Sequence, residues 1–406
     1  MRNRTAQPTG IPAATPTKQR LPLAPLAAMA TASFITVLTE ALPGGLLPAM
    51  SGDLRVSESA MGQAVTVYAI GSAVAAIPLS AATSGWGRKR LLLATMAGFA
   101  VANTLTAISD QYLLTMVGRF IAGVCGGLVW AMMAGYARRM VPSSLHGKAI
   151  AVAMAGTPLS LALGVPAGTL LGQALGWRIA FVTMSLIAVA VLGWLHLTAP
   201  DFPGEQRERR SRVAHTVRLP GVTPVLLVVL TVVLAHTILY TYIATFLDKF
   251  GMVGSTARVL FVFGTASVAA IWFVGSHIHR HLRRLTVTGT LLFAAGATLL
   301  ATLAGSPGFV YAAAALWGLG FGGMATLLQT ALGQAAGPAA DTAQAMLVTL
   351  WNTALALGGV AGGLLLDGLG AGSFPWSVLA ILALVLVTVV VDRHGFPAPR
   401  STATGQ

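Results

Sequence analysis

The chain has 406 residues, of which 55% are hydrophobic and 9% are charged, and its mean hydropathy is +0.78. This composition excludes an ordinary soluble domain and is typical of a protein that crosses a membrane many times. The formal net charge of +14 would suggest nucleic acid in a soluble chain. Here the basic residues lie in short loops between apolar stretches, so we expect a lipid bilayer and no nucleic acid as partner.

The N-terminal stretch 1–20 is polar, basic and contains proline, which predicts a disordered cytoplasmic tail. The apolar stretch after it is too long for the core of a signal peptide, so we expect no cleavage. Twelve apolar runs of about the length that spans a bilayer follow. They cover 24–48, 60–82, 91–109, 112–136, 147–174, 178–198, 221–247, 257–277, 285–305, 308–332, 342–366 and 374–392.

These runs predict an all-α membrane protein with twelve transmembrane helices in two six-helix halves. We expect the halves to cover 21–198 and 221–392, with a cytoplasmic linker at 199–220 and a cytoplasmic tail at 393–406. Short features also repeat: Gly126 and Gly127 recur at Gly322 and Gly323. Two related halves around a central site are an architecture of secondary transporters.

The distribution of basic residues predicts the orientation. With an even number of spans, 20 of the 25 lysines and arginines fall in loops on the side of the termini and four on the other side, while Arg119 lies within a span. Cytoplasmic loops carry such an excess, so both termini are expected in the cytoplasm. The preference for arginine over lysine, with high alanine and glycine, suggests a bacterial cell (inner) membrane.

The first span carries one acid, Glu40, well inside it, followed by Pro43, Gly44 and Gly45. A carboxylate at membrane depth is costly and therefore indicates a functional site. Proline and glycine are tolerated at that depth where the backbone lines a cavity in the protein. We predict that Glu40 carries a coupled proton.

Arg119 in the fourth span lies at about the same depth as Glu40, roughly 10 to 12 Å from the outer edge, counted at 1.5 Å per residue. Equal depth permits the two to pair, or to pair in alternation with a substrate. A purely structural acid, neutralised by Arg119, is the alternative. Aromatic residues near the same level predict an amphipathic substrate cavity lined by Tyr68, Tyr240, Tyr242, Trp317 and His236.

Several short motifs occur in order along the chain: Thr39-Glu40 with Leu46-Leu47-Pro48, Gly87-Arg88-Lys89-Arg90, Arg119 with Gly123 and Gly126-Gly127, Gly164-Val165-Pro166-Ala167-Gly168, and Tyr240-Thr241-Tyr242. Together they resemble the major facilitator superfamily, and within it the twelve-helix drug:proton antiporters of the arabinose-efflux and chloramphenicol-resistance type. The resemblance extends from Leu23 to Val391. It implies that Gly164, Pro166 and Gly168 belong to the antiporter motif.

The same resemblance implies a gating loop formed by Gly85, Gly87, Arg88, Lys89 and Arg90. The family usually carries an aspartate just before this basic cluster, where this chain has Ser84 or Gly85. The equivalent acid after span 8 is replaced by His277 or His279. In the family that acid pairs with the basic residues, so the pairing differs here.

Taken together, the sequence predicts a secondary active transporter that exports a small amphiphilic, drug-like compound in exchange for protons by alternating access. A sugar or metabolite efflux carrier and an uncoupled facilitator are the alternatives. The chain has no phosphate-binding loop of an ATP-driven pump. We expect no metal, because one cysteine and three loop histidines make a poor ligand set. We also expect no enzyme activity and no cofactor. The protein is expected to be a monomer.

Overall fold

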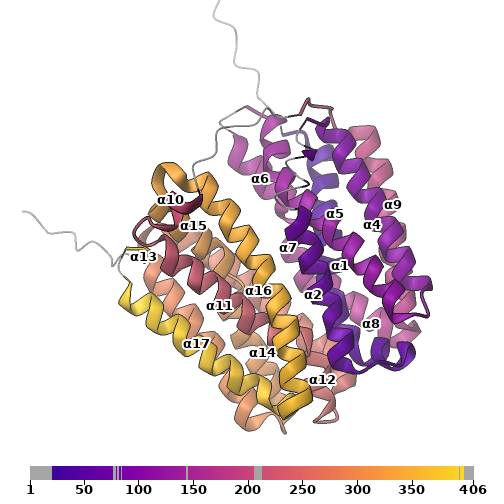
Figure 1. The fold of residues 1–406 in the computed structure, drawn as a ribbon, viewed down its shortest axis with the longest axis vertical. Coiled ribbons are helices and arrows are strands. Elements are labelled where there is room, and N and C mark those ends of the chain that lie inside the picture. Colours follow the sequence, from indigo (N-terminus) through magenta and orange to yellow (C-terminus); the bar gives the residue numbers. More distant parts are fainter. Residues whose placement is uncertain are drawn as a thin grey trace, which may run out of the picture.

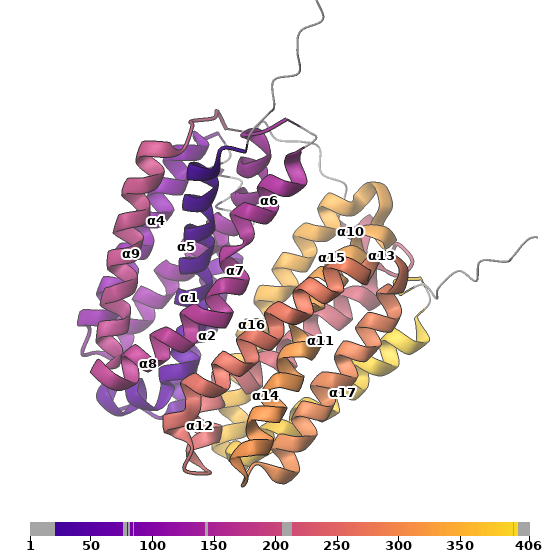
Figure 2. The ribbon, with the colours of Figure 1, turned by 180° about the vertical axis from the view of Figure 1, so that it is seen from behind.

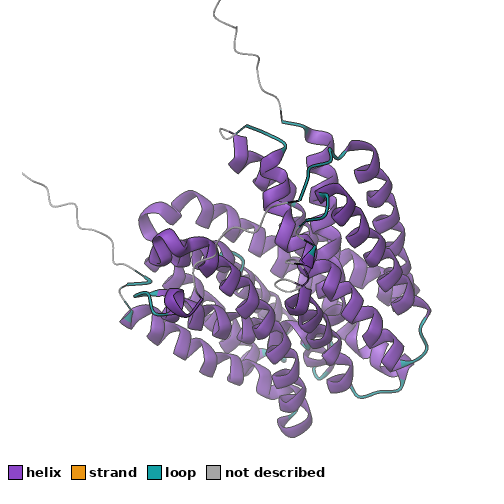
Figure 3. Cartoon of the chain, turned by 45° about the horizontal axis from the view of Figure 1, so that its top comes forward, coloured by secondary structure: helices purple, strands orange, loops and turns teal. Residues whose placement is uncertain are grey.

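A computed structural model describes residues 21–75, 79, 82–83, 85–142, 145–204, 213–392 and 394–396. The predicted tail 1–20 and Ser84 lie outside these residues. Within them every regular element is helical (Figure 3). Eleven helical stretches are long and apolar enough to cross a membrane. The predicted second span is the 17-residue helix α2, which ends where the description is interrupted. The fold is the predicted all-α membrane fold of twelve helices.

The first half contains α1 (Leu23–Leu54), α2 (Glu58–Val74), α4 (Arg88–Ile108), α5 (Tyr112–Arg139) and α9 (Trp177–Thr198) as long helices. Its fifth span is built from α6 (His146–Met154), α7 (Gly156–Leu159), a π-helical turn (Ser160–Gly164) and α8 (Val165–Leu175). The π-helical turn widens the helix just before Pro166, whose ring cannot continue a regular helical ladder.

The second half begins after α10 (Val213–Val217), a short helix inside the predicted linker. It contains α11 (Val222–Thr241), α12 (Ile243–Asp248), α13 (Thr256–Leu303), α14 (Pro307–Phe321), α15 (Met324–Ala336), α16 (Ala340–Leu369) and α17 (Phe374–Val391). Two predicted spans form the single element α13, with non-helical backbone at His281 between them. The predicted span 308–332 is divided at Gly322 and Gly323 into α14 and α15.

The two halves approach each other at one end of the molecule and diverge at the other (Figures 1 and 2). We call these the Leu54 end and the Leu23 end, after the two ends of α1. The buried apolar side chains follow the same division. One cluster joins the second half to residues of the first half at the Leu54 end, such as Leu46, Met50 and Met61. Another cluster is formed by first-half residues, such as Leu26, Met96 and Met133, together with Ala199 at the start of the predicted linker.

Tyr242 lies at the centre of the contact between the halves. The backbone leaves the helical conformation there (φ −107°, ψ 18°), between α11 and α12. Its ring fills the space that a Cβ would occupy at Gly62 on α2 and at Gly362 on α16. Its hydroxyl donates to the carbonyl of Gly359 at 2.9 Å. Tyr242, which the sequence analysis places in the substrate cavity, is fully buried in this contact.

Polar side chains of α2 extend this contact along α16 and α12. Ser59 donates to the carboxylate of Asp367 at 2.8 Å, and Thr66 donates to the carbonyl of Ala356 at 3.0 Å. Thr245 donates to the carboxylate of Glu58. All three bonds join the first half to the second at the Leu54 end, and separating the halves there requires breaking them.

Replacing Tyr242 with phenylalanine is expected to loosen the Leu54 end. The lost hydrogen bond contributes about 1 kcal/mol, so the population with separated halves should rise about fivefold. A cysteine at Leu260, which is buried beside Gly45 of the other half, reports the separation through its rate of alkylation in a Cys125→Ser background. Tyr311→Phe, which removes a hydroxyl elsewhere in the second half, is the control. Equal alkylation rates in both variants would show that the Tyr242 hydroxyl does not hold the contact.

Candidate functional site

The centre of the site is a break in the hydrogen bonding of α1. Pro43 has no N–H group, so the carbonyl of Thr39, four residues earlier, receives no bond from the helix ladder. The guanidinium of Arg119 on α5 supplies the missing donor: its Nη1 atom donates to Thr39 O at 2.5 Å. Pro43 and Arg119 therefore form one structural unit, although 76 positions separate them in the sequence numbering.

Arg119 also makes contacts with α1 and α2. Nη2 donates to the carbonyl of Glu40 at 3.3 Å, and Nε donates to the carbonyl of Ala64 on α2 at 3.3 Å. The guanidinium carbon lies 5.0 Å from the ring centroid of Tyr68. The Tyr68 hydroxyl in turn donates to Thr36 O at 3.4 Å. Arg119 and Tyr68 are both fully buried and tie together α1, α2 and α5.

Glu40 and Arg119 do lie side by side, as their equal depth predicts, but they meet through the backbone of Glu40. Among the described residues, no ion pair joins the guanidinium to the Glu40 carboxylate. The same part of the chain contains no hydrogen-bond partner of that carboxylate, and the side chain is partly exposed. The structure therefore combines a cation bonded through each of its three nitrogens with an acid whose carboxylate has no partner among the described residues.

Glu40 lies on the face of α1 that meets the second half. Gly44 lies one helical turn after Glu40 on the same face of α1, and a Cβ at Gly44 would lie 2.8 Å from the carbonyl of Tyr240 on α11. On the other side, Asn103 donates to the Thr39 hydroxyl at 3.2 Å and fixes this turn of α1.

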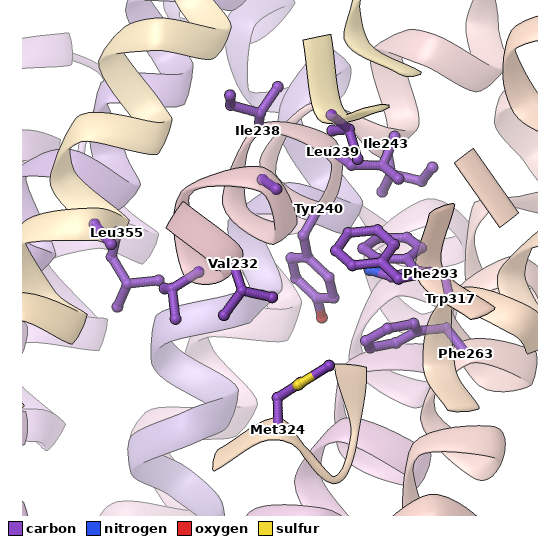
Figure 4. Packing of buried hydrophobic residues seen from close by; sticks show 14 of the residues in the cluster. Val232, Ile238, Leu239, Tyr240, Ile243, Phe263, Phe293, Trp317, Met324 and Leu355 are labelled. Carbon is purple, nitrogen blue, oxygen red and sulfur yellow. The ribbon is translucent and has the colours of Figure 1, made fainter. Parts of the chain in front are cut away.

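The second half presents an aromatic cluster at this position (Figure 4). His236 stacks on Phe321 with ring centroids 3.7 Å apart and planes 6° apart. Trp317 Nε1 lies 3.2 Å from His236 Nδ1 and donates a hydrogen bond to it. Tyr240 and Phe263 lie 5.2 and 5.7 Å from the His236 ring. Trp317 and Phe263 are fully buried behind His236 and Phe321, which are partly exposed.

Three of the predicted cavity residues, Tyr240, Trp317 and His236, thus belong to one cluster. Sequence reasoning missed Phe263 and Phe321, since an aromatic residue in an apolar helix is usually a packing residue. The position of Phe321, four residues after Trp317 on α14, was the available signal, because such residues share a face of a helix.

The glycines of the predicted antiporter motif bring the π-helical turn and α8 close to α1. A Cβ at Gly164 would lie 2.6 Å from Phe34 Cζ, and one at Gly168 would lie 2.9 Å from Leu42 Cδ1. Pro166 is buried at the start of α8. The motif therefore packs against Phe34 and Leu42 of α1, which lie before and after Glu40 in the sequence.

The predicted gating loop lies at the Leu23 end, and Gly87 is its last residue before α4. Arg88 is buried, and its N–H donates to Phe202 O at 2.9 Å. The Arg90 guanidinium lies 5.6 Å from the Trp86 ring. Asp201, which follows α9, lies so near Gly87 that a Cβ there would be 3.1 Å from its carboxylate. An acid is therefore present at this loop, but it comes from the predicted linker. Gly85 is exposed and Lys89 is partly buried.

Comparison with known proteins agrees with this architecture. The sequence profile of the Major Facilitator Superfamily matches residues 29–288. A chloramphenicol efflux pump of Mycobacterium tuberculosis is 31% identical over 92% of this chain and 93% of its own length. A purine ribonucleoside efflux pump of Escherichia coli, NepI, is 28% identical over 87% of this chain and 91% of its own.

Among solved structures, a bacterial homologue of the human lysosomal transporter Spinster, crystallised in an inward-facing and unoccupied conformation, has the same fold. The TM-score is 0.65 with 14% sequence identity, and the alignment covers 92% of this chain and 95% of that one.

Proposed function

Because the chain belongs to the Major Facilitator Superfamily, and is therefore a membrane transporter rather than an enzyme, we propose that it exports a small amphiphilic compound in exchange for protons. Two relatives, a chloramphenicol efflux pump and a purine ribonucleoside efflux pump, support export of uncharged organic compounds. We place the protein in the bacterial cell membrane as a monomer, with the halves 21–198 and 221–392 moving about the linker 199–220.

The open carboxylate of Glu40 is the observation that carries this proposal. It lies far from both ends of α1, and among the described residues nothing pairs with it. An acid that served only structure at this depth would be paired, because an unpaired buried charge is costly. An acid that binds a proton and a substrate in alternation must instead stay accessible.

The positive-inside distribution of basic residues supports an orientation with the Leu23 end in the cytoplasm. The halves diverge at that end, so the described conformation corresponds to one that receives its substrate from the cytoplasm (Figure 1). The contact around Tyr242 then closes the opposite side. Proton binding at Glu40 from outside, followed by release inside, would couple the cycle to the proton gradient.

The proposal is tested with the purified protein in liposomes. With an acidic interior, protein molecules whose cytoplasmic end faces the medium should accumulate labelled chloramphenicol or a labelled purine ribonucleoside above its external concentration, and the interior should lose protons as they do so. An uncoupled facilitator would equilibrate the same compounds at every pH difference. Accumulation of arabinose but of neither aromatic compound would favour the sugar-efflux alternative.

A further inference from the structure

The two ring nitrogens of His236 have different roles. Nδ1 accepts the hydrogen bond of Trp317 Nε1 at 3.2 Å. An indole N–H can only donate, so Nδ1 of His236 carries no proton in this arrangement. The neutral ring therefore carries its proton on Nε2. Because Trp317 is fully buried, its position is fixed and so is the tautomer of His236.

The Nε2–H group of His236 has no acceptor among the described residues, although the side chain is partly exposed at the face of the aromatic cluster. A donor at membrane depth needs a hydrogen-bond partner, which water or a ligand in front of the cluster can provide. Its neighbour Phe321 is stacked parallel to the imidazole and is also partly exposed. The second half thus offers a rigid aromatic surface with one directed N–H donor.

The first half offers the complementary group. Glu40 lies one turn of α1 before Gly44 and on the same face, and Gly44 closely approaches the carbonyl of Tyr240, a member of this cluster. Its carboxylate accepts hydrogen bonds, and the buried cation of Arg119 lies one residue away at the Thr39 and Glu40 carbonyls. The opposite charges of Glu40 and Arg119 offset each other, so the site favours a ligand without net charge.

The geometry points to His236 as a substrate-binding residue whose Nε2–H donates to a neutral, planar aromatic substrate that carries a hydrogen-bond acceptor on its ring. The ring of the substrate lies against His236 and Phe321, and a hydroxyl or N–H group of the substrate reaches Glu40. This inference rests on the proposed export function and names the chemical class of its substrate.

Equilibrium binding to the purified protein, without any gradient, tests the inference. The probes are inosine and chloramphenicol, each paired with an analogue that lacks the exocyclic acceptor attached to the ring: purine riboside, without the C6 carbonyl, and chloramphenicol without its nitro group. Arabinose is the non-aromatic probe. His236→Phe should weaken binding of at least one acceptor-bearing probe about tenfold, which corresponds to one hydrogen bond, and leave its analogue unchanged.

Two further variants separate a direct contact from a structural effect. His236→Gln retains a donor and an acceptor and should restore most of the affinity. In His236→Phe/Trp317→Phe the buried indole N–H is also removed, so no unsatisfied donor remains, and the loss of affinity should match that of the single variant. Trp272→Phe, on a strongly exposed side chain of α13, is the matched control and should bind as the parent does.

The inference is overturned if no aromatic probe binds at millimolar concentration, or if His236→Phe weakens each probe and its analogue equally. It is also overturned if His236→Phe leaves all affinities unchanged while transport driven by the pH difference persists. If the parent protein shows no proton-coupled transport but still binds each probe more tightly than its analogue, the proposed exchange of substrate for protons is contradicted. The assignment of His236 then remains intact.

Discussion

Glu40→Gln is expected to abolish accumulation of substrate against a gradient while leaving exchange of substrate across the membrane measurable. Glutamine keeps the size and polarity of the side chain but cannot bind and release a proton. The substrate can therefore still occupy the site, whereas the step that ties its movement to the proton gradient is lost. Uptake into liposomes with an acidic interior should fall to the level of equilibration, and the pH dependence of exchange should flatten.

Asp248→Asn is the matched control for this experiment. Asp248 is an exposed acid at the end of α12, so its neutralisation should leave both accumulation and exchange as in the parent protein. If Glu40→Gln still concentrates its substrate and still releases protons in proportion, Glu40 does not carry the coupled proton.

Arg119→Leu is expected to destabilise the protein by about 2 kcal/mol, since it leaves the buried Thr39 carbonyl without a donor. The carbonyls of Glu40 and Ala64 lose less, because both keep the donors of their own helices. The midpoint of thermal unfolding in detergent should fall accordingly. The variant also removes the cation nearest to Glu40, so its transport is measured separately from its stability.

The Pro43→Ala background identifies the cause of that loss. Alanine restores an N–H at position 43, and this group can donate to Thr39 O within the helix. Arg119→Leu should then cost at least about 1 kcal/mol less than in the parent, as expected for two residues that serve one carbonyl. Additive effects of the two substitutions would mean that Arg119 stabilises the protein through its other contacts.

The sequence by itself determined the class of the protein and the depth of its candidate functional groups in the membrane. Hydrophobic run lengths place twelve spans, because each run must cover the same thickness of lipid. Counting residues from the span ends places Glu40 and Arg119 at equal depth, and the structure does bring them together. The family followed from short motifs at fixed places in this order of spans.

The partners of these groups were decided only by the tertiary structure. Depth along a helix does not fix the direction of a side chain, which depends on how neighbouring helices rotate and pack. Arg119 therefore binds the carbonyl that Pro43 leaves open, rather than the carboxylate of Glu40. For the same reason the ring of Tyr242 lies between Gly62 of α2 and Gly362 of α16. Tyr240, two residues earlier, packs near His236 instead.

Contacts between residues far apart in the sequence could not be predicted either. The bond between Trp317 and His236 joins α14 to α11, and the approach of Asp201 to Gly87 joins the predicted linker to the start of α4. Neither pair leaves a local pattern, because each depends on helices that meet only after the bundle has assembled. Membrane thickness constrains where each residue lies along the bilayer normal, and helix packing alone sets which residues then face one another.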